Sequence, residues 1–366
     1  MTGVQTCALP ISPDPGYCAY GATRIRERVR QLAGEIEGVR KAEDIEAVHR
    51  MRVASRRIRA ALPLFSCCIP QKKYLRWTRE IRDITRALGD ARDKDVQIEF
   101  LTSYRKRFPL NGKGNPEQEY LALFHIPSEP CISDEGQNHQ ESCIVPRREY
   151  GIDCLLLRYH QERTRLQAPV RQALRRLEKD KTLKRMDTFF RKWESDAGSS
   201  GKTLGCRIAS KRIGSIITEL RKYAESLSDT ERKDDHHQMR IIAKQLRYTM
   251  ELYGDLYEGG LKKEIQNLRH LQDLLGEIHD CDVWIELLPH FLEEEAGRVE
   301  SYFGKRDFLR LIEPGIEDLL TNRSSERDDL FRKLGITWKD LEVELFWEGL
   351  LRKVYLKTGE FVENHP

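Results

Sequence analysis

The chain has 366 residues, of which 33% are charged and 39% are hydrophobic, a balance typical of a charge-rich helical protein and not of a disordered one. No stretch approaches the roughly 18 to 20 apolar residues that a transmembrane helix needs. The net charge of +4 is unevenly distributed, because residues 17–110 carry 22 Lys and Arg against 12 Asp and Glu. We expect this part of the chain to present a surface for an anionic partner, and a merely solvated basic surface is the alternative.

The first residues, MTGVQTCALPI, lack the basic start and the apolar core of a targeting peptide. They match the translation of a sequencing-adapter end. We therefore interpret residues 1–16 as an artefactual or disordered N-terminus, with Met1–Ile11 introduced during sequence assembly. The nine cysteines are scattered and never form Cys-x-x-Cys. Without a secretory signal, we expect them to be reduced intracellular thiols.

Helix signals dominate the rest of the chain, and no convincing run of alternating strand residues is present. Residues 109–149 are rich in Pro, Gly, Ser and Asn and predict a long insertion, while SDAGSSGKT at 195–203 predicts a linker. The linker divides the chain into a first helical bundle, 17–194, and a second, 204–358. In chain order, helices are predicted near 20–37, 43–66, 71–88, 92–107, 150–180, 183–194, 204–227, 233–254, 260–276, 280–296, 300–320 and 324–355, the last with a break near Gly335.

An internal repeat straddles this linker. Copy one reads VHRMRVASRRIRAAL (48–62) and then IRDITRALGDARDKDV (81–96). Copy two reads HHQMRIIAKQLRYTM (236–250) and then LRHLQDLLGEIHDCDV (268–283). Two long blocks in the same order predict an all-α fold built as two pseudo-symmetric helical bundles that arose by internal duplication.

The first block of each copy predicts a helix with two opposed faces. At about 100° per residue, four basic side chains of copy one share an arc of about 80°, and the apolar side chains lie nearly opposite. We call the basic residues of both copies the basic stripes; they are His49, Arg52, Arg56 and Arg59 in copy one, and His237, Arg240, Lys244 and Arg247 in copy two. Neighbouring positive charges on a helix repel each other, so a stripe that occurs twice predicts binding of a phosphate-rich anion.

Other arginines could extend the stripes. The second block of copy one carries Arg79, Arg82 and Arg86 at helical spacing, whereas copy two keeps only Arg269 of these three. The pairs that could contribute from other helices are Arg207 with Lys211, Arg158 with Arg165, and Arg323 with Arg327. For each pair, an ordinary surface role is the alternative.

The motifs GDARDKDV and GEIHDCDV close the second blocks. Asp-x-Asp can hold Mg²⁺, but a glycine followed by aspartates favours a helix break with an N-cap. A further alternative is a structural ion pair, in which Asp93 or Asp280 holds an arginine of a basic stripe.

With these motifs in both copies, the chain resembles the CHAD domain (conserved histidine α-helical domain) over roughly residues 17–355. The resemblance implies a pseudo-twofold pair of helical bundles around a basic central groove or pore, which binds inorganic polyphosphate as a non-catalytic targeting or accessory module without a cofactor. It also implies a cytoplasmic protein, with association with polyphosphate granules as one expectation, and no membrane partner. The implied binding residues are His49, Arg52, Arg56, Arg59, Arg82, Arg86, His237, Arg240, Lys244, Arg247 and Arg269.

The chain departs from the family pattern at two positions of copy two. Gln245 stands where copy one has Arg57, and His279 stands where copy one has Arg92. Many relatives follow a CYTH domain, a triphosphate-processing barrel marked by Glu-x-Glu-x-Lys. Here the sole candidate, Glu342 and Glu344, has no lysine in register. An accessory role beside such an enzyme therefore stays an alternative.

Three rival interpretations remain. Glu46-x-x-His49 is half of a di-iron pattern, but the adjoining arginines oppose a multivalent cation. A zinc site built from His125, Cys131, His139 and Cys143 has no standard spacing. Single-stranded nucleic acid is the stronger rival, although such proteins interleave aromatic residues for base stacking, and Tyr248 is the nearest candidate. If the stripe histidines contact phosphate, affinity should rise as the pH falls through about 6.5.

Overall fold

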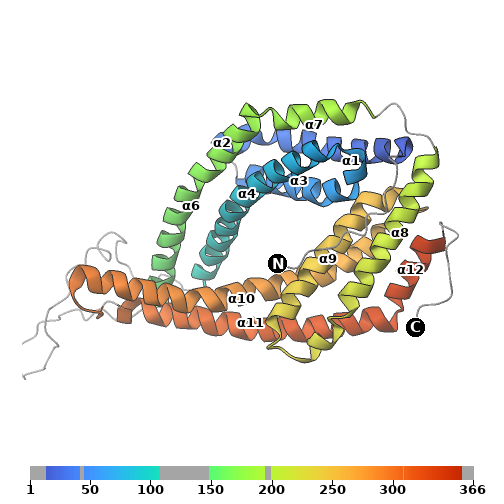
Figure 1. Ribbon diagram of the computed structural model, residues 1–366. Helices are drawn as coiled ribbons and strands as arrows, with labels where there is room; N and C mark the ends of the chain where they lie inside the picture. Colours follow the sequence, from blue (N-terminus) through green and yellow to red (C-terminus); the bar gives the residue numbers. More distant parts are fainter. Residues whose placement is uncertain (1–13, 42–44, 108–147, 194–198, 308, 357–366) are drawn as a thin grey trace, which may run out of the picture. The chain divides into compact units, whose positions relative to one another are not determined.

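The computed structural model describes residues 14–41, 45–107, 148–193, 199–307 and 309–356. These ranges hold helices and turns and contain no strand, so the predicted all-α class is confirmed (Figure 1). The 109–149 insertion lies outside them except for its last two residues. Residues 1–13 of the predicted artefactual or disordered N-terminus, 1–16, also lie outside them, whereas its last three residues cap and begin α1. The α-helices are α1 (Pro15–Gly34), α2 (Ile36–Lys41), α3 (Ile45–Leu64), α4 (Gln71–Arg105), α6 (Arg148–Lys179), α7 (Thr182–Arg191), α8 (Ser199–Arg221), α9 (Lys233–Tyr253), α10 (Lys262–Phe303), α11 (Leu309–Val343) and α12 (Phe346–Leu356).

Several predicted helix breaks are wrong. Helices α4, α10 and α11 run without interruption through Gly89, Gly276 and Gly335. A glycine inside a helix costs only about 1 kcal/mol relative to alanine, and buried residues on both sides of it, such as Leu88 and Ala91, outweigh that cost in α4. The predicted linker is also partly wrong, because residues 199–203 form the first turn of α8.

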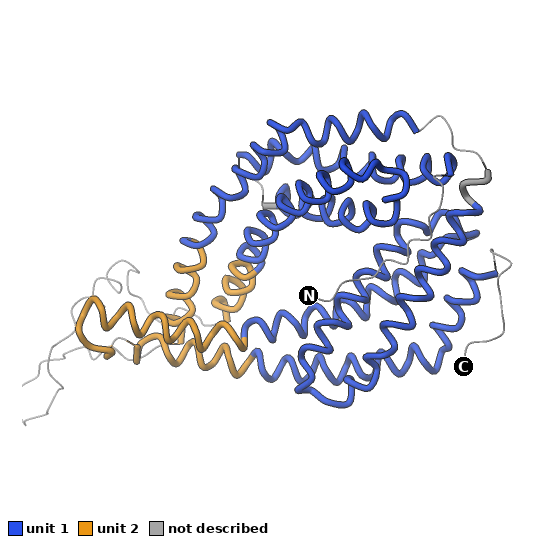
Figure 2. Tube along the Cα trace, in the orientation of Figure 1, with its two compact units in different colours: residues 1–96, 161–284, 323–366 blue, residues 97–160, 285–322 orange. Residues whose placement is uncertain are grey.

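The chain clusters into two compact units (Figure 2). Unit 1 comprises residues 1–96, 161–284 and 323–366, and unit 2 comprises residues 97–160 and 285–322. Both copies of the repeat therefore lie within unit 1. Unit 1 also contains one continuous hydrophobic core, to which apolar residues of α3 and of α9 both contribute.

Helix α1 joins the two copies inside unit 1. It begins at an N-cap, where the side chain of Asp14 accepts a hydrogen bond from the backbone N–H of Tyr17 at 2.7 Å. It packs against α3 on one side and against α8, the neighbour of α9, on the other. The hydroxyl groups of Tyr17 and Tyr253 lie 2.7 Å apart in the buried core, and the Tyr20 hydroxyl donates to the backbone oxygen of Leu252. The beginning of α1 therefore fastens the end of α9 to the first half of unit 1, and α3 and α9 are in contact.

A disulfide bond links Cys18 in the first turns of α1 to Cys68, which follows α3. The expectation that the cysteines are reduced thiols is therefore wrong for this pair. Sequence spacing does not reveal which cysteines meet, because 50 residues separate the two partners. Four further described cysteines keep their thiol groups: Cys67, Cys154, Cys206 and Cys281.

Unit 2 is assembled from the adjoining ends of α4, α6, α10 and α11. Helices α6 and α11 approach each other closely at Gly151 and Gly315. A Cβ added to Gly151 would lie 2.2 Å from the carbonyl oxygen of Ile312. Ion pairs tie the other helices together, among them Arg158 with Glu295 at 2.7 Å. Arg158 therefore has a structural partner within unit 2. No described helix combines the length and the apolar character that a bilayer crossing requires.

Candidate functional site

Helices α3 and α9 have the two opposed faces that the sequence predicts. Met51 and Ile58 on α3 are completely buried, as are Met239 and Leu246 on α9. On the other face, the stripe residues are half-buried, except for Arg59, which is exposed. The helical period thus places the apolar residues in the core and keeps the cations next to solvent.

The fold brings the central members of the two basic stripes into one electrostatic environment. The ammonium group of Lys244 loses solvent and also faces Arg240 on its own helix and Arg56 on α3, which lowers the pKa of Lys244 to about 7. Desolvation also lowers the pKa of Arg240, with a further contribution from Arg56. Like charges from segments almost 190 residues apart therefore converge within unit 1.

In copy one, the arginines are held by α4. The guanidinium of Arg52 lies 3.2 Å from a carboxylate oxygen of Asp93. It also lies against the backbone of α4, since a Cβ added to Gly89 would be only 3.1 Å from its Nη1 atom. About two turns further along α3, desolvation and the neighbouring charges of Arg82 and Arg86 lower the pKa of Arg59. The absence of a side chain at Gly89 therefore leaves room for Arg52. The predicted helix break at this glycine is wrong.

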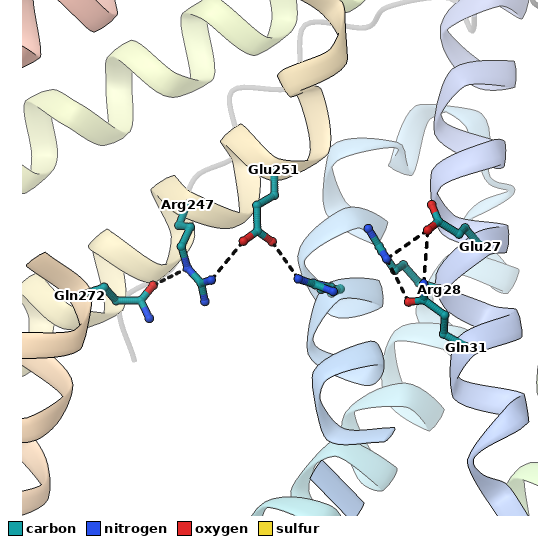
Figure 3. Close-up of polar contacts among 7 residues, drawn as sticks. Glu27, Arg28, Gln31, Arg247, Glu251 and Gln272 are labelled. Atoms are coloured by element: carbon teal, nitrogen blue, oxygen red, sulfur yellow. Dashed lines mark hydrogen bonds and ion pairs between the residues drawn. The ribbon is translucent and has the colours of Figure 1, made fainter. Parts of the chain in front are cut away.

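In copy two, Arg247 belongs to a chain of polar contacts (Figure 3). Its Nε donates to the side-chain oxygen of Gln272 at 2.7 Å, and its Nη1 donates to Glu251 at 3.0 Å. The other carboxylate oxygen of Glu251 accepts from Arg57 on α3 at 3.4 Å. One carboxylate thus links an arginine from each copy.

Tyr248 lies beside two arginines. The guanidinium carbon of Arg247 is 4.9 Å from the centre of the Tyr248 ring, and that of Arg56 is 5.6 Å from it. Both distances are within the range of cation–π attraction. The ring therefore positions one arginine from each copy, a role that sequence alone did not reveal because α3 must first be placed beside α9.

The histidines behave differently in the two copies. The Nδ1 atoms of His237 and His279 lie 3.3 Å apart. Desolvation, followed by the charge of Arg240, lowers the pKa of His279 to about 4, and the same two causes lower the pKa of His237. His49 is half-buried and has no hydrogen-bond partner among the residues that the structure describes. Burial and the charge of Arg240 thus favour the neutral form of both histidines in copy two.

The aspartates of the closing motifs hold arginines. Asp95 is 7% exposed and lies 2.6 Å from Arg163 of α6, and Asp282 lies 2.5 Å from Arg327 of α11, which is 4% exposed. The Arg52–Asp93 contact confirms the ion-pair interpretation for copy one, whereas Asp95 and Asp282 hold arginines that lie outside the basic stripes. The N-cap interpretation is wrong, because both motifs lie inside helices. Within the described ranges, no group of three or more His, Cys, Asp or Glu side chains could hold a metal ion.

Some predicted residues lie apart from this convergence. Arg269 is exposed on α10 and lines a shallow pocket with Lys262 and His270. Arg79 and Arg86 line a cavity of about 520 Å³ between α4 and α6, which also contains several carboxylates. The extra pairs have other settings: Arg207, Lys211 and Arg165 are exposed, and Arg323 and Arg327 are buried.

Comparisons with known proteins agree on one family. The family model described as "CHAD domain" matches residues 23–289. A solved structure, the crystal structure of the CHAD domain from the plant Ricinus communis, is similar with a TM-score of 0.56 and 19% sequence identity. That similarity covers 91% of this chain and 96% of the plant chain. No curated protein matches by sequence.

Proposed function

The chain belongs to the CHAD domain family, and on that premise we propose that it binds inorganic polyphosphate along the basic stripes of α3 and α9. The observation that carries this proposal is that basic residues of both copies meet: the Tyr248 ring on α9 has the guanidinium carbon of Arg247 at 4.9 Å and that of Arg56 on α3 at 5.6 Å from its centre. Desolvation and the charges of Arg240 and Arg56 accordingly lower the pKa of Lys244. Converging cations oppose one another unless an anion lies between them. A linear chain of phosphates supplies a negative charge for each of them.

The proposed contact residues differ in how directly the structure supports them. Arg52, Arg56, Arg240 and Lys244 form the centre of the site, because they share one electrostatic environment. Arg59 with Arg82 and Arg86 extends it along α4. His49, His237 and Arg247 complete the stripes, and Arg269 is the least supported member, because it is exposed and lines a pocket made of α10 residues alone.

The wider proposal follows the duplication. The two copies form the two sides of a basic groove, as pseudo-symmetric halves of one clamp, and the protein acts as a binding or targeting module without catalysing a reaction. We place it in the cytoplasm, on polyphosphate granules where these form. An accessory role beside a triphosphate-processing enzyme would use the same groove.

Single-stranded nucleic acid is the alternative ligand. Base stacking needs an accessible aromatic ring, and Tyr248 already contacts two guanidinium groups. This arrangement favours a ligand that consists entirely of phosphate.

The deciding experiment is a competition between long-chain polyphosphate and single-stranded RNA of matched charge, titrated over a series of salt concentrations. The affinity for both ligands should fall as the salt concentration rises, because binding of either one releases counterions. We expect polyphosphate to displace RNA at every salt concentration. Tighter binding of RNA at matched charge would overturn the choice of ligand, and no binding of either would overturn the site.

A further inference from the structure

An exposed thiol lies beside the buried disulfide bond. Cys18 is 1% exposed and Cys68 is 6% exposed, so both sulfur atoms of the bridge belong to the core of unit 1. The adjacent Cys67 is exposed and free. Its Sγ lies 3.8 Å from the Sγ of Cys68. Three sulfur atoms therefore cluster at the end of α3, and only one of them is open to solvent.

Access decides how such a bridge can form and open. Thiol–disulfide exchange requires a thiolate to reach a disulfide sulfur directly, so burial slows attack by an external thiol. The burial of Cys18 and Cys68 closes this route from solvent. Cys67 meets both requirements, because it is exposed to solvent and its Sγ lies 3.8 Å from the Cys68 sulfur of the bridge.

We propose that Cys67 is a modification site for small thiols and disulfides, and that it relays their exchange to the Cys18–Cys68 bridge. In the opening direction, the Cys67 thiolate attacks the sulfur of Cys18 and expels the Cys68 thiolate. The new Cys18–Cys67 bridge has one exposed sulfur. An external thiol attacks that sulfur at Cys67 and expels the Cys18 thiolate, and a second external thiol releases Cys67 as a free thiol.

These steps balance without any other reactant. Two external thiols become one external disulfide, and the protein bridge becomes two thiols. Closure runs through the same steps in reverse. Cys67 first reacts with an external disulfide, forms a mixed disulfide with one half of it, and releases the other half as a thiol. Attack on Cys18 is favoured over attack on Cys68, because the Cα atoms of neighbouring residues are about 3.8 Å apart, below the range of roughly 4.4 to 6.8 Å that disulfides adopt.

The position of the cluster gives this exchange a structural consequence. The bridge ties α1 to the segment after α3. The hydroxyl of Tyr17, the residue before Cys18, donates to the carbonyl oxygen of Leu64 at 3.0 Å and contacts Tyr253 at the end of α9. Opening the bridge therefore releases a covalent link at the place where α1, α3 and α9 meet. The inference stands independently of the ligand that the basic stripes bind.

The test compares the full chain with Cys67→Ser and, as a matched control, with Cys154→Ser in unit 2. Each oxidised protein is treated with dithiothreitol, quenched with an alkylating reagent at timed intervals, and mapped by mass spectrometry. Opening of the Cys18–Cys68 link should be slower by on the order of tenfold or more in Cys67→Ser, and unchanged in the control. Desolvation raises the pKa of the Cys67 thiol, so opening of the unaltered chain should accelerate with rising pH.

A second measurement identifies the first site of attack. The reduced chain, exposed to oxidised glutathione, should carry its first adduct on Cys67 and later lose it as the Cys18–Cys68 link forms. Opening of Cys67→Ser at the rate of the unaltered chain would overturn the proposal. A first adduct on Cys18 or Cys68, or an oxidised chain without the Cys18–Cys68 link, would overturn it as well.

Discussion

The two copies of the repeat hold their cations by different means. In copy one, the second helix is α4, which supplies carboxylates and additional arginines. Arg52 forms an ion pair with Asp93, and the charge of Arg82 acts on Arg59. In copy two, the corresponding helix is α10. Its Gln272 accepts a hydrogen bond from Arg247, and the Nδ1 atom of its His279 lies 3.3 Å from that of His237. The stripe of copy one consists of guanidinium groups after its histidine, whereas that of copy two includes Lys244, whose pKa lies near 7.

This difference teaches that duplication has preserved the position of the cations but not their chemistry. Guanidinium groups stay charged at every physiological pH. The ammonium of Lys244 does not, because it loses solvent and faces arginines of both copies. We therefore expect copy one to supply constant attraction and copy two to supply the pH dependence.

Reversing one charge in each copy should have the largest effect. Arg52→Glu together with Arg240→Glu places two carboxylates in the shared environment, and the one on α3 would also face Asp93. With about 1.5 to 3 kcal/mol for each charge-assisted contact, polyphosphate affinity should fall by roughly 100-fold or more. Isothermal titration calorimetry measures the affinity, and circular dichroism checks that helicity is unchanged.

The matched control reverses two exposed arginines outside the stripes, Arg165→Glu with Arg207→Glu. It should change the affinity only a few-fold at moderate salt, because distant surface charges are screened. An equal loss in both double variants would mean that only net charge matters.

The pH dependence of polyphosphate affinity should give the next largest difference between the copies. A bound polyanion raises the pKa of Lys244 above the value of about 7 in the free protein, so binding takes up a proton above that pH. Affinity should therefore be highest below pH 7 and fall by up to about tenfold per pH unit as the pH rises through 7, until the pKa of the bound state is reached. Titrations over a pH series test this slope, which Lys244→Arg should abolish.

The histidine prediction changes accordingly. The pKa of His237 is lowered in the free protein. Its protonation would therefore add affinity only at pH values below the ordinary pKa of a histidine. His237→Gln should leave the slope above pH 7 intact. Loss of that slope in His237→Gln would assign the neutral-pH titration to the histidine pair.

The aligned arginines of the second helices should give a smaller contrast. The charge of Arg82 acts on Arg59, whereas Arg269 is exposed and lines a pocket made of α10 residues alone. Arg82→Gln should weaken polyphosphate binding by roughly 1 kcal/mol, about fivefold, and Arg269→Gln by less than twofold. Equal losses, measured by the same titration, would place α10 in the groove after all.

The two aligned glycines should give the smallest contrast. A methyl group at Gly89 would press on Arg52, whereas one at Gly276 meets no atom within 4 Å. Gly89→Ala should therefore lower polyphosphate affinity about two- to threefold, while Gly276→Ala should leave it unchanged. Both lie inside helices, so thermal unfolding should show a gain of up to about 1 kcal/mol for Gly276→Ala. Identical affinities in the two variants would mean that Arg52 relaxes without consequence.

The sequence predicted the features that depend on a single helix. The all-α class, the two-faced helices and the alignment of Arg52 with Arg240 follow from helical periodicity and from the repeat. It did not predict that α4 and α10 run through their glycines, because local propensity suggested a stop and buried neighbours overrode it. Ion pairing was predicted for Asp93 or Asp280, and Asp93 does contact Arg52. The pairs of Asp95 with Arg163 and of Asp282 with Arg327 were not predicted, because these arginines come from distant helices.

Contacts between the copies were beyond sequence reasoning for a geometric reason. Glu251 and Arg57 are 194 residues apart, and nothing in either helix alone indicates that they meet. The same holds for Tyr248 beside Arg56. The repeat places Arg56, Arg57 and Tyr248 on their helices, but only the packing of α3 next to α9 reveals which residues they contact.

The placement of both stripes on one folded chain has a consequence for ligand length. Under the proposed function, each stripe alone would be a weak half-site, and a polyanion that reaches both would bind the second without another encounter in solution. Its effective concentration there is set by the fixed spacing between α3 and α9, which are in contact. Avidity should therefore rise steeply with the number of phosphates until both half-sites are spanned, and then level off.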